Sequence, residues 1–239
     1  MSAGLDIQLR PAQRKILEYT RGWMGISAVP GSGKTWTLSL LAAQIIAQSH
    51  LRPDQEVLVV TLVNSAVENF NRRVSTFIQA MGLLPNLGYR VRTLHGLAHD
   101  IVRPRPALVG LDENFQIVDE RESESILNEA AQSWLRSHPG GLDGFLSSDL
   151  DERSRARIDH AELPKLVQDI ALAFIRTAKA QQLTPVLLRK RLDSFQVPLP
   201  LAEMGCSIYS DYQRALNYRA SVDFDDLVRL ALQALRTNG

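Results

Sequence analysis

Apolar residues follow two different patterns along the chain. Up to about residue 102, short apolar runs alternate with segments in which apolar residues recur at helical spacing. The runs predict strands at residues 23–29, 55–63 and 89–94, and the periodic segments predict helices at residues 36–48, 65–82 and 96–102. This alternation of strand and helix predicts an α/β fold with a parallel sheet.

Two local signals refine these elements. The consecutive apolar residues 57–60 indicate a strand that is buried on both faces. Ser65, with Glu68 three positions later, has the pattern of a capping box. This pattern predicts that Ser65 starts the following helix, and Gly82 is the residue type expected at its end.

After residue 107 the pattern is helical throughout, and no strand is predicted. Helices are expected at residues 120–135, 163–181, 185–192, 201–218 and 224–235. In the second of these helices, one stripe predicts the buried face, formed by Leu166, Ile170, Ala173, Phe174 and Thr177. Pro104 and Pro106 separate the two patterns. We therefore expect a first domain at residues 1–105 and an all-helical domain at residues 106–239.

Composition limits the classes of protein that need to be considered. A hydrophobic content of 45% is sufficient for a globular core. Cys206 is the single cysteine, so no internal disulfide can form, which suits a reducing cytosol. The first ten residues have no apolar core of signal-peptide length, and the most apolar stretch, residues 38–47, is too short to span a bilayer. We expect a cytoplasmic protein without a membrane partner, and the net charge of +1 indicates no particular ligand.

Residues 28–35 read Ala-Val-Pro-Gly-Ser-Gly-Lys-Thr, the pattern of a phosphate-binding loop. Gly31 and Gly33 permit a tight turn whose backbone N–H groups converge on phosphate oxygens. Lys34 provides a cation for the β- and γ-phosphates, and Thr35 provides a hydroxyl for Mg²⁺. Ala28 stands where the strict pattern has glycine. A predicted strand precedes the loop and a predicted helix follows it, so the positive end of the helix is expected to face the phosphates.

Several further segments follow one another in the order known from one family. They read Leu-Arg-Pro-Ala-Gln at residues 9–13, Val-Thr-Leu-Val-Asn-Ser-Ala at 60–66, Arg-Thr-Leu-His-Gly at 92–96 and Val-Asp-Phe-Asp-Asp-Leu at 222–227. With these motifs, residues 9–235 resemble the N-terminal part of UvrD/PcrA/Rep-type superfamily 1 DNA helicases. The resemblance implies an incomplete RecA-like P-loop NTPase domain with a parallel sheet and an all-helical insertion subdomain.

The same resemblance implies an activity and its ligands. It implies ATP hydrolysis with Mg²⁺, coupled to unwinding of DNA or translocation along it in the 3′→5′ direction. The implied partner is single-stranded or partial-duplex DNA, in a process such as DNA repair. Lys34 and Thr35 are then the candidate catalytic residues, with Thr35 on Mg²⁺. The candidate nucleotide-binding set is Gln13, Ala28, Pro30, Gly31, Ser32, Gly33, Lys34, Thr35 and Trp36.

Individual residues carry more specific expectations from the resemblance. Gln13 would read the adenine edge, since a carboxamide can pair with adenine through two hydrogen bonds. Trp36 stands where the family usually has an arginine over the adenine, and it either stacks there or anchors its helix on the sheet. The DNA path would be lined by Thr61, Asn64, Thr93 and His95. Leu62 and Ser65 replace the aromatic residue and the lysine that are common in the family, which predicts weaker DNA contact at that loop.

The family also has parts that the resemblance does not reach. The D-E-x-Q motif, which supplies carboxylates to Mg²⁺ and the attacking water, would follow shortly after Gly239, and the second RecA-like domain would come later. We therefore expect this chain alone to hydrolyse ATP slowly or not detectably, and the rest of the helicase to be its partner, in the same chain or a second one. We also expect poor solubility or marginal stability, because an apolar sheet edge would be open. Two-state melting at an ordinary mesophile temperature would contradict this expectation.

Two alternative hypotheses remain. Residues 115–120, Phe-Gln-Ile-Val-Asp-Glu, could be an apolar strand that ends in Asp119 and Glu120, as in a self-contained P-loop ATPase or kinase. The helical interpretation is preferred, because Asp119 with Glu122 has the chemistry of a helix start. The chain could also be a non-catalytic nucleotide-binding remnant of a truncated or split gene. Asp223 is interpreted as an N-cap with Asp226 in the first helical turn, and neither is interpreted as catalytic.

Overall fold

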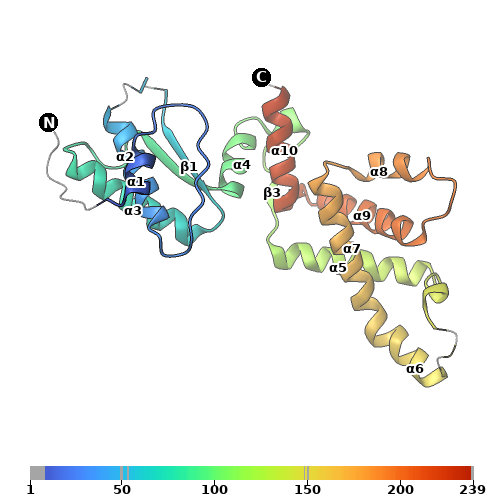
Figure 1. Ribbon diagram of the computed structural model, residues 1–239. Helices are drawn as coiled ribbons and strands as arrows, with labels where there is room; N and C mark the ends of the chain where they lie inside the picture. The colour runs from blue at the N-terminus through green and yellow to red at the C-terminus, as the bar shows by residue number, and fades with distance from the viewer. Residues whose placement is uncertain (1–8, 49–50, 53, 148, 150, 238–239) are drawn as a thin grey trace. The chain divides into compact units, whose positions relative to one another are not determined.

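The computed structural model describes residues 9–48, 51–52, 54–147, 149 and 151–237. The chain forms two compact units, Met1–Leu97 and Ala98–Gly239, which are described separately (Figure 1). The division between them falls inside a helix, whereas the domain boundary proposed from the sequence follows residue 105. Within the described residues, no helix is both long and apolar enough to cross a membrane.

The first unit is a small parallel sheet covered by helices. Strands β1 and β2 pair in parallel, from Val57 opposite Tyr89 to Thr61 opposite Thr93. Helices α2 and α3 pack against each other and against both strands, and α1 packs against α2 (Figure 1). The elements are α1 (Pro11–Leu17), α2 (Lys34–Gln48), β1 (Val57–Thr61), α3 (Asn64–Ala80), β2 (Tyr89–Thr93) and α4 (Leu94–Val102), which continues into the second unit.

The sheet of the first unit is buried on one face only. Val57 and Val59 pack into the core under α2 and α3. Leu58 and Val60 point the other way, and each is 45% exposed. The predicted burial of this strand on both faces is therefore wrong in the described residues. An apolar run cannot by itself reveal whether a second layer of helices is present to cover the outer face.

The predicted strand at residues 23–29 is also absent from the described structure, where this segment is irregular. Trp23 is fully exposed and Val29 is 73% exposed. A strand is stable only when a neighbour in the sheet satisfies its backbone groups. In the described part of the chain the sheet of this unit consists of β1 and β2, so residues 23–29 take no place in a ladder.

Helix α3 begins one residue earlier than the sequence indicates. Val63 is its N-cap residue, without a side-chain hydrogen bond, so the predicted capping box at Ser65 is wrong. Val63 has the extended backbone of an N-cap residue, so the first helical turn begins at Asn64 and includes Ser65. The end of the helix is confirmed, because Gly82 adopts a left-handed φ of 77° after the last turn.

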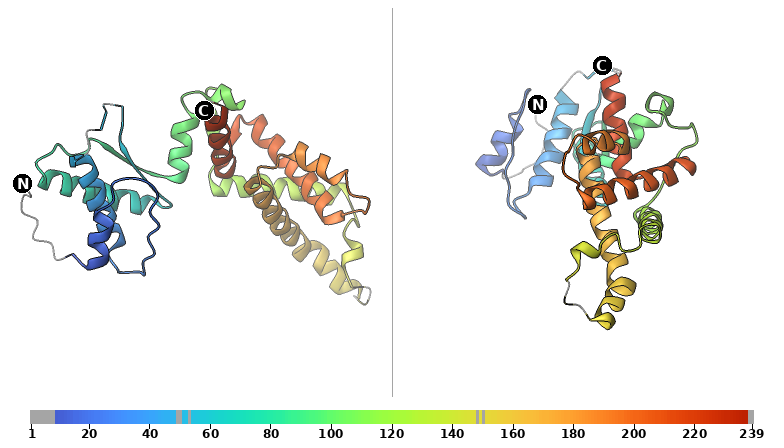
Figure 2. Two further views of the ribbon diagram at one scale, coloured as in Figure 1. Left: turned by 45° about the horizontal axis from the view of Figure 1, so that its top comes forward. Right: turned by 90° about the vertical axis from the view of Figure 1, so that its right-hand side faces the viewer.

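The second unit is mainly helical. Its elements are η1 (Pro106–Val109), β3 (Gln116–Ile117), α5 (Glu120–Ser137), η2 (Asp143–Phe145), α6 (Glu152–Arg157), the π-turn η3 (Ile158–Glu162), α7 (Leu163–Ala180), α8 (Pro185–Leu192), α9 (Pro200–Tyr218), β4 (Ser221–Val222) and α10 (Phe224–Thr237). The views of Figures 1 and 2 agree that α6 and α7 follow each other as one nearly continuous rod.

The prediction of no strand after residue 107 is wrong, because the second unit contains a pair of short strands. Gln116 and Ile117 of β3 pair in parallel with Ser221 and Val222 of β4. Two-residue strands leave no periodic signal in a sequence, which explains why the pattern did not show them. Around this pair, an apolar cluster joins α4, η1 and α10 through Val102, Val109, Phe115, Val222, Leu227 and Leu230.

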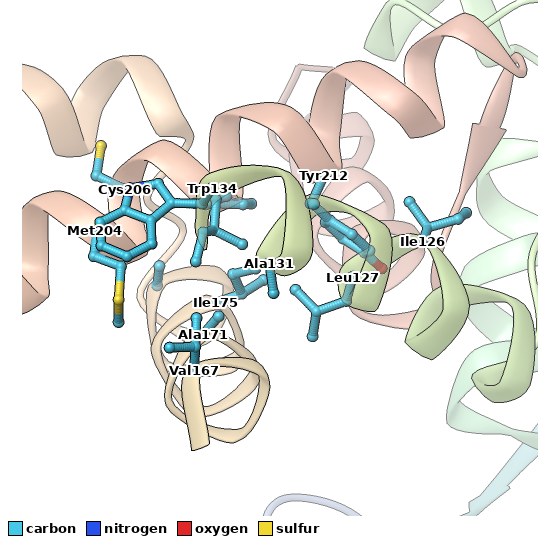
Figure 3. Close-up of a cluster of buried hydrophobic side chains, with 14 of the residues drawn as sticks. Ile126, Leu127, Ala131, Trp134, Val167, Ala171, Ile175, Met204, Cys206 and Tyr212 are labelled. Atoms are coloured by element: carbon cyan, nitrogen blue, oxygen red, sulfur yellow. The ribbon is translucent and has the colours of Figure 1, made fainter. Parts of the chain in front are cut away.

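The larger core lies among α5, α7, α8 and α9 (Figure 3). Trp134 of α5 and Ile175 of α7 lie in this core with residues of α9, among them Met204. The backbone approaches closely at Gly205, where an added Cβ would lie 2.7 Å from the Phe174 ring. These helices therefore pack as one unit around a continuous apolar interior.

The prediction of the buried face of α7 is wrong, because the residues that are buried lie about one position later along the helix than the predicted ones. The structure buries Val167, Ala171, Ile175 and Ala178, whereas Leu166 is 53% exposed. Apolar residues cover much of the circumference of this helix, since it packs against both α5 and α9. The pattern identified the helix correctly, but it could not select which apolar face is buried.

Candidate functional site

The phosphate-loop motif forms a tight turn that leads directly into helix α2. Gly31 has φ of 76° and Gly33 has φ of 84°, both in the left-handed region that favours glycine. The Ser32 N–H donates to the Val29 carbonyl at 3.2 Å and closes the turn. A Cβ at Gly33 would lie 3.1 Å from Gln13 Nε2, so this position also needs glycine for close approach.

The groups at this turn fit a bound triphosphate with Mg²⁺. Lys34 begins α2 and is exposed, so its ammonium can reach an anion at the helix N-terminus. Thr35 is in the first turn, and its hydroxyl makes no hydrogen bond within the described residues. Ser32 Oγ is buried and also has no hydrogen-bond partner among them, which leaves a polar atom for a ligand to satisfy.

Gln13 is held beside the loop by a chain of hydrogen bonds. Its Oε1 accepts from the backbone N–H of Arg10 at 3.0 Å, and its Nε2 donates to Thr37 Oγ1 at 3.0 Å. Thr37 Oγ1 in turn donates to the Gly33 carbonyl at 3.0 Å. A carboxamide has two N–H donors and two acceptor lone pairs, so one donor and one lone pair of Gln13 are left for a base.

Trp36 serves as a packing residue in the structure. Its ring meets the Phe77 ring edge to face, with centroids 5.5 Å apart and an angle of 88° between the planes. This contact anchors α2 against α3 within the core of the first unit. Of the two interpretations of Trp36, the structure supports the anchor, and stacking on adenine stays a prediction.

The four candidate DNA-binding residues gather at one edge of the sheet. Thr61 and Thr93 end β1 and β2 and lie opposite each other in the ladder. Asn64 opens α3 directly after β1, and His95 follows β2 in the first turn of α4. In parallel sheets, ligands bind at the carboxyl ends of the strands, and this is that end. The Thr93 hydroxyl accepts a hydrogen bond from the Gly96 N–H at 3.0 Å.

Leu62 lies at the same edge and is 79% exposed. An aliphatic side chain there can offer apolar contact but no ring on which a base could stack. The expectation of weak DNA contact at this loop is therefore compatible with its exposure, and the roles of the four residues in DNA binding stay predictions.

Asp119 caps helix α5. Its Oδ1 accepts from the backbone N–H of Glu122 at 2.8 Å, which confirms the helix-start interpretation. Glu120 is the first helical residue, with a side chain 75% exposed and 3.4 Å from the guanidinium of Arg176. β3 ends at Ile117, so these carboxylates do not end a long apolar strand.

This geometry predicts the effect of Glu120→Gln. The substitution removes one exposed ion pair, which is worth about 0–1 kcal/mol, and leaves the cap at Asp119 intact. Nucleotide binding and folding stability should therefore be unchanged, as checked by nucleotide titration and urea unfolding. Asp119→Ala, on the other hand, should cost about 1 kcal/mol of stability through loss of the cap. Loss of ATP hydrolysis in the Glu120→Gln variant would instead support the self-contained ATPase hypothesis.

A buried ionic cluster in the second unit was not predicted. Lys179 Nζ lies 2.5 Å from Asp223 Oδ2 and 2.9 Å from Asp226 Oδ2, with the Lys179 and Asp226 side chains at most 1% exposed. The Tyr212 hydroxyl donates to Asp223 Oδ2 at 2.6 Å, and Arg229 Nε lies 3.2 Å from Asp226 Oδ1. The cluster thus ties α7, α9 and α10 together through paired charges.

The predicted N-cap of α10 is confirmed within this cluster, because Asp223 Oδ1 accepts from the Asp226 N–H at 2.8 Å. Burial raises the pKa of Asp223, but the ammonium of Lys179 and three hydrogen bonds to the carboxylate outweigh it, so the pKa lies below its ordinary value. The sequence held one signal for the cluster. Lys179 follows Ala171 and Ile175 at helical spacing, which places it on the buried face of α7.

The described residues contain no group of three or more His, Cys, Asp or Glu side chains placed to hold a metal ion. One family profile, described as the UvrD/REP helicase N-terminal domain, matches residues 9–239. The chain belongs to this family. The match covers the phosphate loop, the sheet and the helical unit of this UvrD/REP-type chain.

Individual relatives extend the comparison. A probable DNA helicase II homolog of Rickettsia felis is 28% identical over 222 residues, which cover 92% of this chain and 28% of the relative. The ATP-dependent DNA helicase SRS2 of Saccharomyces cerevisiae is 26% identical over 95% of this chain and 18% of its own length. The ATP-dependent DNA helicase PcrA of Staphylococcus aureus is 22% identical over 90% of this chain and 25% of its own length.

The UvrD/REP-type chain therefore spans 18–28% of the length of these curated relatives. Membership in the family implies a P-loop NTPase-like fold and the use of a nucleotide. The observed α/β first unit, with a phosphate loop before α2, agrees with that fold.

Proposed function

We propose that this chain is the N-terminal ATP- and DNA-binding segment of an ATP-dependent DNA helicase that acts in the cytoplasm. The observation that carries the proposal is the loop at Gly31–Gly33, with two left-handed glycines and Lys34–Thr35 at the start of α2. Family membership and the printed names of the relatives, which include ATP-dependent DNA helicases, support it. The first unit is then part of a RecA-like domain.

The proposed roles follow from the positions of the side chains. Lys34 neutralises charge on the β- and γ-phosphates, and Thr35 holds Mg²⁺ through its hydroxyl. The backbone N–H groups around Ser32 and the positive end of α2 stabilise the triphosphate. Mg²⁺-ATP, when bound, supplies the phosphoryl group whose hydrolysis releases the free energy for movement along DNA.

DNA is proposed to cross the edge formed by Thr61, Asn64, Thr93 and His95. These residues lie where β1 and β2 end. A movement of the sheet or of the neighbouring helices would therefore shift the residues that contact the bound DNA. We propose single-stranded or partial-duplex DNA as the partner and movement along it in the 3′→5′ direction, as the resemblance to UvrD/PcrA/Rep-type helicases implies. Because the relatives are much longer, the complete activity is assigned to a larger assembly that includes a second RecA-like domain.

Nucleotide titration tests the proposal directly. Residues 1–239 should bind Mg²⁺-ATP, and removal of Mg²⁺ with a chelator should weaken the binding. The turnover of ATP should be slow or undetectable, because an arginine finger, which is worth about 10³–10⁵ in rate, comes from elsewhere in such motors. A folded protein that fails to bind Mg²⁺-ATP would overturn the proposal.

Gln13→Ala should reduce the preference for ATP over GTP. The substitution removes the group proposed to pair with the adenine edge, and a pair of hydrogen bonds is worth about 1–3 kcal/mol. The affinity for ATP should therefore fall by about tenfold or more, while that for GTP changes little. Competitive titration of the two nucleotides provides the measurement.

Thr37→Val is the matched control for this experiment. It removes the hydroxyl that joins Gln13 to Gly33 but keeps the carboxamide. If Gln13 acts on the base, Thr37→Val should weaken ATP and GTP alike, because it loosens the loop. An equal loss for both nucleotides in Gln13→Ala would show that Gln13 only supports the loop.

A further inference from the structure

A cavity in the second unit lies apart from the ionic cluster and belongs to no role proposed above. Its volume is about 500 Å³, and it lies between the C-terminal end of α5, the loop that follows it, and the start of α7. Small-molecule sites have volumes of roughly 300–1,000 Å³, so this one is large enough for a ligand.

The polar side chains of the cavity are mostly cationic or can become so. Arg136, His138 and His160 line it, and within the described residues Arg136 makes no ion pair. Asp143 is the acidic residue of the lining, and its carboxylate is engaged by Arg155 at 2.7 Å. The charge of Arg136 is therefore not compensated inside the cavity, which favours an anionic ligand.

His138 has a defined orientation. Its Nδ1 lies 3.0 Å from the Trp134 carbonyl, and a carbonyl can only accept, so Nδ1 carries the proton. The imidazole also stacks on the Trp134 ring, with centroids 4.6 Å apart and planes 11° apart. Nε2 is left for a ligand, as an acceptor in the neutral ring or a donor in the imidazolium.

The rest of the wall is apolar. Leu142 is buried in the main core, and Leu163 packs against that core where it meets the cavity. Pro139 and Pro164 add further apolar surface to the lining. A ligand that fits this wall therefore needs an apolar part in addition to its anionic group.

Two backbone features shape the cavity. An added Cβ at Gly141 would lie 3.1 Å from the His138 carbonyl and 3.3 Å from Trp134 Cη2, so a larger residue would push the loop away from the indole. His160 lies in the π-turn Ile158–Glu162, which interrupts the rod of α6 and α7. π-turns of this kind frequently occur at functional sites.

We propose that this cavity is a binding site for an oxyanion, a phosphate or a carboxylate, carried on a small apolar body. Arg136 and the two histidines bind the oxyanion, while Leu163 and the prolines contact the apolar part. The oxyanion can come from a free small molecule or from a phosphodiester of DNA. The proposal does not depend on the nucleotide site, since all of its residues lie in the second unit.

Fluorescence of Trp134 tests the proposal locally. The chain has three tryptophans, so Trp23→Phe and Trp36→Phe leave Trp134 as the reporter beside the cavity. Phenyl phosphate, which combines an oxyanion with an apolar ring, should change the emission in a saturable way. Phenol, which lacks the oxyanion, should bind at least about tenfold more weakly, because a charge-assisted hydrogen bond is lost.

Variants of the lining residues separate this site from other anion sites. Arg136→Met and His160→Gln should each weaken phenyl phosphate by about tenfold or more. Arg153→Met, which changes an exposed arginine of α6 outside the lining, should have no effect, and neither should Lys34→Ala in the phosphate loop. Circular dichroism establishes that each variant is folded.

The outcomes decide between the possibilities. A saturable change that Arg136→Met abolishes and Arg153→Met retains supports the site. No saturable change, or the same response in the Arg136→Met variant, overturns the proposal. Where the site is supported, displacement of phenyl phosphate by a short single-stranded oligonucleotide identifies DNA as the source of the oxyanion. Binding that the oligonucleotide does not displace identifies a free small molecule.

Discussion

Replacing Lys34 with alanine is expected to weaken the binding of Mg²⁺-ATP by about ten- to a hundredfold. The exposed ammonium at the start of α2 is the only charged side chain within the turn at residues 30–35, so its removal leaves phosphate charge to backbone groups alone. Calorimetric titration of residues 1–239 with Mg²⁺-ATP measures the loss. Since Lys34 is exposed, the free energy of unfolding should change by less than about 0.5 kcal/mol.

Lys190→Ala is the control for this experiment. Lys190 is an exposed lysine of α8 in the other unit, so it changes the net charge by the same amount without touching the loop. Its affinity for Mg²⁺-ATP should equal that of the unchanged chain. Equal losses in the two variants would mean that Lys34 acts only through overall charge and that the loop is not the nucleotide site.

Replacing Lys179 with methionine should destabilise the protein by about 3–5 kcal/mol. In the unchanged chain, the ammonium of Lys179 lies close enough to the carboxylates of Asp223 and Asp226 to neutralise both. The substitution leaves these carboxylates buried without their ammonium partner. Urea unfolding followed by circular dichroism measures the free energy of unfolding. Hydrogen exchange should show the largest loss of protection in α10, because the cluster attaches that helix to α7 and α9.

Lys165→Met provides a control on the same helix. Lys165 pairs with Asp169 at 2.8 Å, but both side chains are more than half exposed, so the pair is worth only about 0–1 kcal/mol. A loss for Lys179→Met as small as that for Lys165→Met would contradict the assignment of a structural role to the buried cluster.

The cluster also implies a pH dependence of stability. The pKa of Asp223 lies below its ordinary value of 3.8 in the folded state, so the unfolded chain binds a proton more readily. The stabilisation from Asp223 is therefore complete above the ordinary value and is lost as the pH falls through the lowered one. In Lys179→Met, the Asp223 carboxyl loses the cationic neighbour that lowers its pKa, so the pKa rises and protonation relieves part of the cost of burying the charge. The loss of stability of the variant relative to the unchanged chain should therefore become smaller as the pH falls.

Helix termini and the phosphate loop could be predicted because their chemistry is local. Asp119 bonds to a backbone group three residues away, and Thr184 with Pro185 starts α8 in the same local manner. The loop at Gly31 and Gly33 needs a backbone conformation that few other residue types adopt. In each case a short segment contains both partners of the interaction that defines it.

Features that depend on distant partners could not be predicted in this way. The strand expected at residues 23–29 would need a neighbouring strand, and the outer face of β1 would need a second layer, neither of which is a property of the segment itself. Lys179 and Asp223 are far apart in sequence, so their pairing follows from the packing of α7 against α10. The Gln13–Thr37 bond is a similar case, although the resemblance had already placed Gln13 beside the nucleotide.

The short pair of β3 and β4 has a consequence for the order of folding. It joins Gln116 and Ser221, about a hundred residues apart, and closing a flexible loop of that length costs about 4 kcal/mol in entropy. Two paired residues cannot offset such a cost, so the pair cannot form in an open chain. Helices α5, α7, α8 and α9 must condense first and bring the ends together. We therefore expect the pair to form late in folding, after the helices between its two strands have assembled.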